Sequence, residues 1–69
     1  MTWNEACYAI LTDPKANGYA KAYAKAGLSM NSGIERRTQA LYILNNLSHW
    51  RAPSAKQVRT VLKSFSKGA

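Results

Sequence analysis

The chain has 69 residues, less than half the length of an ordinary domain, so it has room for a single small folding unit, residues 1–69. Ten lysines and arginines stand against three acidic residues, which gives a net charge of +7. The single cysteine excludes a disulfide framework and a thiolate zinc site, since each needs several cysteines. Three isolated carboxylates and one histidine do not supply paired acid and base groups, so we expect no catalytic activity, no cofactor and no metal.

The first predicted helix covers residues 3–12. Thr2 and Glu5 have the spacing of a capping box, in which each residue satisfies a free amide at the start of the helix. Apolar residues then recur with helical spacing on one face: Trp3, Cys7, Ile10 and Leu11. This pattern makes Cys7 a small core residue.

The second predicted helix covers residues 14–26. Asp13 and Pro14 are expected to serve as its N-cap and first helical residue, and Gly27 as the left-handed residue that follows its end. The Asn17-Gly18 pair leaves a second interpretation open, because residues 14–18 could instead form a turn that delays the helix to Tyr19.

The third predicted helix covers residues 33–48 and starts at a second capping box, Ser32 and Glu35. Its apolar residues extend around most of its circumference, which predicts a position at the centre of the fold. These residues are Ile34, Ala40, Leu41, Ile43, Leu44 and Leu47, and the remaining polar strip is Glu35, Gln39, Tyr42 and Asn46.

The fourth predicted helix covers residues 54–67, after a break at Pro53. Ser54 and Gln57 match the capping box a third time, and the apolar stripe is Val58, Val61, Leu62 and Phe65. Four helices with short connections predict a compact all-α single domain, in which the last two helices form an antiparallel hairpin.

A basic stripe on the fourth helix is the main candidate binding site. It lies opposite the apolar residues and consists of Lys56, Arg59, Lys63 and Lys67, and no acidic residue follows Glu35. A row of cations suits the phosphate backbone of DNA or RNA, because each neutralised phosphate releases a counterion. Three further arginines are candidate contacts: Arg36, Arg37 and Arg51. A solvated helix face and an acidic protein partner are the alternatives.

Three aromatic residues are candidate anchors for a partner: Trp50, Tyr19 and Tyr23. Trp50 lies at the bend between the last two helices, where it either contacts a partner or folds back over the hairpin. Tyr19 and Tyr23 alternate with Lys21 and Lys25, as aromatic and basic residues do in proteins that bind single strands. Packing inside the protein is the alternative for both tyrosines.

The segment LYILNNL at residues 41–47, followed by Trp50-Arg51 and by AKQVR at residues 55–59, resembles a pattern in short phage and mobile-element reading frames. The resemblance covers roughly the C-terminal 40% of the chain, and no known activity is associated with the pattern. It implies an accessory protein that acts by stoichiometric binding, either to nucleic acid or to a host protein. Inhibition of a CRISPR effector is one such role, although a chain of charge +7 cannot be an acidic mimic of nucleic acid.

We expect a cytoplasmic protein that does not associate with membranes. The longest apolar run, residues 40–44, is far shorter than the ~20 residues that span a bilayer, and residues 1–5 lack the basic start of a signal peptide. The core of so short a chain is thin, which leaves a homodimer open.

Overall fold

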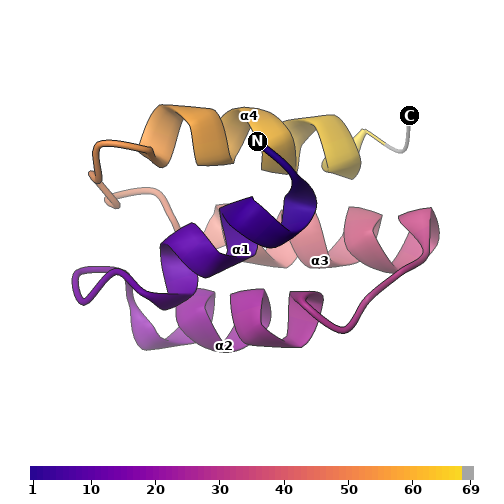
Figure 1. The fold of residues 1–69 in the computed structure, drawn as a ribbon, viewed down its shortest axis with the longest axis horizontal. Helices are drawn as coiled ribbons and strands as arrows, with labels where there is room; N and C mark the ends of the chain where they lie inside the picture. The colour runs from indigo at the N-terminus through magenta and orange to yellow at the C-terminus, as the bar shows by residue number, and fades with distance from the viewer. Residues whose placement is uncertain (68–69) are drawn as a thin grey trace.

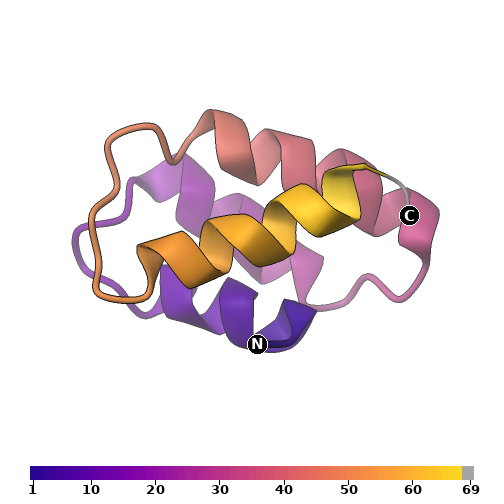
Figure 2. The ribbon, with the colours of Figure 1, turned by 90° about the horizontal axis from the view of Figure 1, so that it is seen from above.

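The computed structural model describes residues 1–67, which form four helices and no strand. The helices are α1 (Trp3–Leu11), α2 (Gly18–Gly27), α3 (Gly33–Asn45) and α4 (Ala55–Ser66). They lie in a ring in which α1 and α3 each contact both α2 and α4 (Figures 1 and 2). The predicted all-α fold is therefore confirmed, and α3 and α4 form the expected antiparallel hairpin (Figure 1).

Two of the three predicted capping signals mark helix starts. At α1, the Glu5 N–H donates to Thr2 Oγ1 at 3.1 Å and the Thr2 N–H donates to Glu5 Oε1 at 2.8 Å, so the capping box is complete. At α3, Ser32 Oγ accepts from the Glu35 N–H at 3.1 Å. Ser54 makes no such bond at α4, because its backbone (φ −94°, ψ 3°) is not in the extended conformation that a capping side chain needs. The third capping box is wrong.

The second helix begins at Gly18 rather than at residue 14. Asn17 is its N-cap, and Asn17 Oδ1 accepts from the Ala20 N–H at 2.8 Å. Asp13 uses its carboxylate locally instead, because Oδ1 accepts from the Lys15 N–H at 2.8 Å and so closes a turn. Of the two interpretations of residues 14–18, the turn is correct.

Gly27 is the last residue of α2 and is buried, so its predicted role beyond the helix end is wrong. An added Cβ would lie 3.1 Å from Trp3 Cζ2 and 3.3 Å from Cys7 Sγ. Trp3 Nε1 also donates to the Gly27 carbonyl oxygen at 2.8 Å. The position favours glycine because the side chains of Trp3 and Cys7 on α1 lie close to the backbone of α2.

The core lies inside the ring, and α3 is not at its centre. Ile34 is 83% exposed and Leu41 is exposed, whereas Ile43 is fully buried. Gln39, predicted on the polar strip, is buried and donates from Nε2 to the Tyr23 carbonyl oxygen at 2.7 Å. In a ring of four helices each member buries only its inner arc, so the wide apolar surface of α3 is partly left in solvent. Cys7 is fully buried, as predicted.

Candidate nucleic-acid interface

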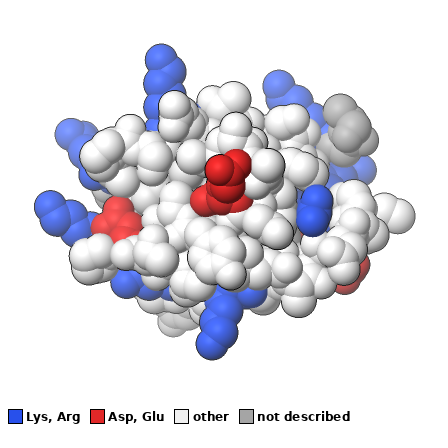
Figure 3. Space-filling model, in the orientation of Figure 1, with Lys and Arg blue, Asp and Glu red and all other residues white. Residues whose placement is uncertain are grey.

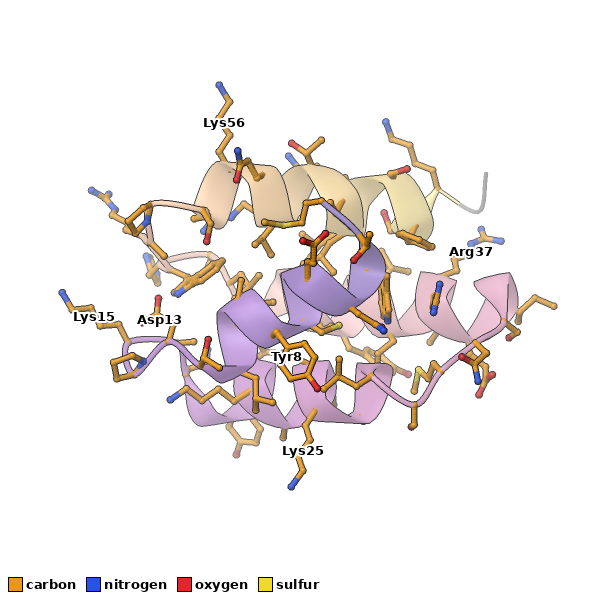
Figure 4. All side chains as sticks on the ribbon, viewed as in Figure 1. Tyr8, Asp13, Lys15, Lys25, Arg37 and Lys56 are labelled. Atoms are coloured by element: carbon orange, nitrogen blue, oxygen red, sulfur yellow. The ribbon has the colours of Figure 1, made fainter. Side chains whose placement is uncertain are left out.

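Three lysines lie on the outer side of α4, away from its buried residues Val58 and Leu62. Lys56, Lys63 and Lys67 are all exposed and fall within about 40° on a helical wheel. Their positions along the helix axis differ by about 10 Å and 6 Å. Figure 4 shows Lys56 pointing away from the body of the protein. We call these three residues the lysine row.

Arg59, the fourth member of the predicted stripe, makes contacts within the protein instead. Its side chain is half-buried and turns toward the connection between α3 and α4. Its guanidinium donates to the carbonyl oxygen of Leu47 and to that of Trp50, the latter at 2.6 Å. Arginine commonly donates to carbonyls beyond a helix end in this way, so Arg59 stabilises the hairpin rather than extending the lysine row.

Arg36 is also held by the protein. Its Nε donates to the Met30 carbonyl oxygen at 2.9 Å. Its Cζ lies 5.5 Å from the centre of the Trp3 ring and 5.6 Å from that of Phe65, which are cation–π distances. Trp3 and Phe65 themselves meet edge to face with centroids 5.0 Å apart. Arg36 therefore closes the core at the end where α1, α3 and α4 meet.

Arg37 and Arg51 are exposed, and Figure 4 shows Arg37 directed outward. Lys15 and Lys25 also point outward, from other sides of the protein. On the face that α1 covers, basic side chains project from the rim while the middle is largely uncharged apart from acidic atoms (Figure 3). Basic side chains thus project around the edge of this face, and the lysine row on α4 is one part of them.

Trp50 is not a surface anchor, because it is only 5% exposed and folds back over the hairpin. Tyr19 and Tyr23 are both more exposed than Trp50. Tyr19 is 73% exposed, and Tyr23 is half-buried with its ring 5.5 Å from that of Tyr42. Sequence reasoning missed Tyr42 as a candidate, because it assigned this residue only to the polar strip of its helix.

Two titratable side chains, Cys7 in the core and Asp13 in the turn before α2, have pKa values that the fold shifts. Burial raises the pKa of the Cys7 thiol to about 11, so this thiol is protonated at neutral pH. Hydrogen bonds from the Lys15 backbone and the Trp50 side chain lower the pKa of Asp13. Within residues 1–67 no group of three histidine, cysteine or acidic side chains could hold a metal ion.

A surface hollow of about 530 Å³ lies between the start of the chain and α4. It is lined by Met1, Glu5, Lys56, Gln57, Thr60 and Val61. One carboxylate and one ammonium group are therefore among the side chains around it.

No helix in the described part of the chain is both long and apolar enough to cross a bilayer. Comparisons of the chain with protein-family models, with curated proteins and with solved structures gave no match.

Proposed function

We propose that this protein binds the phosphate backbone of nucleic acid through the lysine row, without reading base sequence. The observation that carries the proposal is the exposure of Lys56, Lys63 and Lys67 on one side of α4, in a stretch of sequence that has no acidic residue after Glu35. Surfaces that serve only solubility usually mix the two signs of charge. A row of one sign instead favours a polyanion, which releases counterions when its phosphates are neutralised.

Binding of this kind has a measurable signature in its dependence on salt. For duplex DNA, the logarithm of the binding constant falls with the logarithm of salt concentration by about 0.9 for each phosphate contact. Replacing Lys56, Lys63 and Lys67 by glutamine should therefore flatten this slope by about 2.7. The fold should persist, because all three side chains are exposed and glutamine is a good helix former.

A matched control is available on the opposite side of the ring. Changing Lys15, Lys21 and Lys25 to glutamine removes the same amount of charge from α2 and the turn before it, and α2 does not contact α4. If the lysine row binds duplex DNA, this control keeps the parent's salt slope. Equal losses in the two variants would show that binding follows net charge alone and would overturn the proposal.

An acidic protein surface is the competing partner. If the parent protein binds neither duplex nor single-stranded DNA at low salt, the basic surface serves such a partner. The role of a phage accessory protein that inhibits a host protein, such as a CRISPR effector, then takes first place.

A further inference from the structure

Two tyrosines meet where α2 packs against α3, and a third precedes them by one turn of α2. Tyr19 and Tyr23 are one turn apart on α2, and Tyr42 of α3 stacks on Tyr23 with ring centroids 5.5 Å apart and planes tilted by 33°. Tyr19 is 73% exposed and Tyr42 is 48% exposed. We call these three residues the tyrosine surface. It offers two aromatic stations about 6 Å apart along the α2 axis, one at Tyr19 and one at the Tyr23–Tyr42 pair.

Hydrogen bonds between the two helices hold this surface in place. Gln39 of α3 donates to the Tyr23 carbonyl oxygen at 2.7 Å. At the other end of the seam, Asn17 Nδ2 donates to the Asn46 carbonyl oxygen at 2.7 Å, and within the last turn of α3 Asn46 Nδ2 donates to the Tyr42 carbonyl oxygen at 2.9 Å. The backbones that carry Tyr23 and Tyr42 are therefore fixed relative to each other, so a ligand need not order them on binding.

The charge of the whole protein selects the kind of ligand, since ten basic residues against three acidic ones give +7. On α2 itself, Lys21 and Lys25 lie on the side of the helix away from Tyr19 and Tyr23, and the Asp13 carboxylate attracts Lys15 and Lys21. Lys15 and Lys25 are exposed, and Figure 4 shows the Lys25 side chain extending away from α2. Exposed aromatic rings on a protein of net charge +7 suit a single strand, since its bases stack on the rings while its phosphates are attracted by the positive charge.

We propose that the tyrosine surface binds the unpaired bases of single-stranded nucleic acid. This inference rests on the proposed binding of nucleic acid and adds a second surface to it. A duplex keeps its bases stacked inside and offers only phosphates, so it has nothing to place on Tyr19 or Tyr42. The protein should accordingly bind a single strand by stacking at the tyrosine surface in addition to phosphate contacts.

The test measures the affinity of the variant Tyr19→Ala for oligothymidylate and for a duplex of equal length. Because base stacking on one aromatic ring is worth about a 5- to 100-fold change in affinity, the variant should lose at least about 5-fold for the single strand. Its affinity for the duplex should not change. Tyr19→Phe keeps the ring and should restore binding of the single strand. Tyr42→Ala should resemble Tyr19→Ala, provided that its thermal melt shows a folded protein.

Tyr8 provides a matched control, since it is 54% exposed but lies on α1 rather than on the α2–α3 seam. Tyr8→Ala should bind both nucleic acids as the parent does. A loss for Tyr8→Ala as large as that for Tyr19→Ala would show that any exposed tyrosine suffices, and the inference would be wrong.

The outcomes separate this inference from the proposed function. If Tyr19→Ala binds oligothymidylate as tightly as the parent while the lysine-row variant loses salt dependence on duplex DNA, only the tyrosine surface is disproved. If the affinity for oligothymidylate depends on Tyr19 but the salt slope on duplex DNA is the same for the lysine-row variant and the parent, only the proposal for α4 fails. If sedimentation shows self-association that Tyr19→Ala abolishes, with no effect on oligothymidylate, the surface binds a second copy and the inference is overturned.

Discussion

Asp13 and Trp50, 37 positions apart in the sequence, are joined by a hydrogen bond of 2.8 Å from the indole Nε1 to Oδ2 of the carboxylate. The same carboxylate closes the turn before α2 by accepting from the Lys15 N–H. The bond thus ties the α1–α2 connection to the α3–α4 connection, which lie at the same end of the ring in Figure 1. It also explains why the indole of Trp50 folds back instead of facing solvent.

The Asp13–Trp50 bond predicts a dependence of stability on pH. Hydrogen bonds from the Lys15 backbone and then from the Trp50 side chain lower the pKa of Asp13 in the folded protein below 3.8, the ordinary value of an aspartate side chain. A lowered folded pKa means that the stabilisation is complete at pH values above 3.8 and is lost as pH falls through the folded value. In thermal melts at decreasing pH, Asp13→Asn should lose less stability than the parent below about pH 4. Parallel curves for the two proteins would show that the bond contributes nothing.

Gly27 and Gly18 should respond in opposite ways to alanine. At Gly27 a new Cβ would meet Trp3 Cζ2 at 3.1 Å, and Trp3 cannot move freely because it is bonded to the Gly27 carbonyl. Overpacking of this kind outweighs the better helix propensity of alanine, so Gly27→Ala should lower the free energy of unfolding by about 1–2 kcal/mol. Gly18 has no atom within 4 Å of a new Cβ, so Gly18→Ala should be neutral or stabilising. Urea denaturation followed by tryptophan fluorescence checks both.

The orientation of α3 is tested by two isoleucines on the same helix. Ile43 is fully buried, so Ile43→Ala should cost about 2–5 kcal/mol and unfold a large fraction of so small a protein. Ile34 is 83% exposed, so Ile34→Ala should change stability by no more than about 0.5 kcal/mol. Circular dichroism melts of the two variants suffice, and similar losses in both would mean that α3 is rotated from the position described.

Neighbouring arginines on α3 should also differ. Arg36→Ala removes the bond to Met30 and the contacts with the Trp3 and Phe65 rings, so it should destabilise the protein by about 1–3 kcal/mol. Arg37 is exposed, and Arg37→Ala should leave the unfolding free energy within about 0.5 kcal/mol of the parent. Equal midpoints in urea for the two variants would exclude a structural role for Arg36.

Patterns among residues close together in the sequence predicted the four helices. Contacts between residues far apart in the sequence could not be predicted in this way. The capping box at Thr2 and the serine cap at Ser32 work within one turn, so the sequence alone reveals them. The burial of Gln39 and the exposure of Ile34 depend on which arc of α3 faces α2 and α4. Helical periodicity could not decide this, because the apolar residues of α3 spread around most of its circumference.

The candidate binding site was predicted from the positions of the basic residues. The structure removes Arg59 and Arg36 from it, because both side chains bind groups elsewhere in the protein. Arg59 has the helical spacing of a lysine-row residue, but the carbonyls it contacts belong to residues nine and twelve positions earlier. Arg36 likewise contacts the ring of Trp3, which lies near the start of the sequence. Among the exposed aromatics, Tyr42 became a candidate only when the structure placed its ring beside that of Tyr23.

Arg59 and Lys63 provide the sharpest separation of structure from binding, because they lie one turn apart on α4. Arg59→Gln leaves the Trp50 carbonyl without its donor and removes one of the two donors to the Leu47 carbonyl, which keeps the Trp50 N–H, so it should cost about 1–3 kcal/mol of stability. Its salt slope on duplex DNA should stay at the parent value at temperatures where the variant is folded. Lys63→Gln should do the reverse, with stability within about 0.5 kcal/mol of the parent and a slope lower by about 0.9. If Arg59→Gln melts like the parent and loses the salt dependence, the guanidinium leaves its carbonyls to contact phosphate, and Arg59 belongs to the binding surface after all.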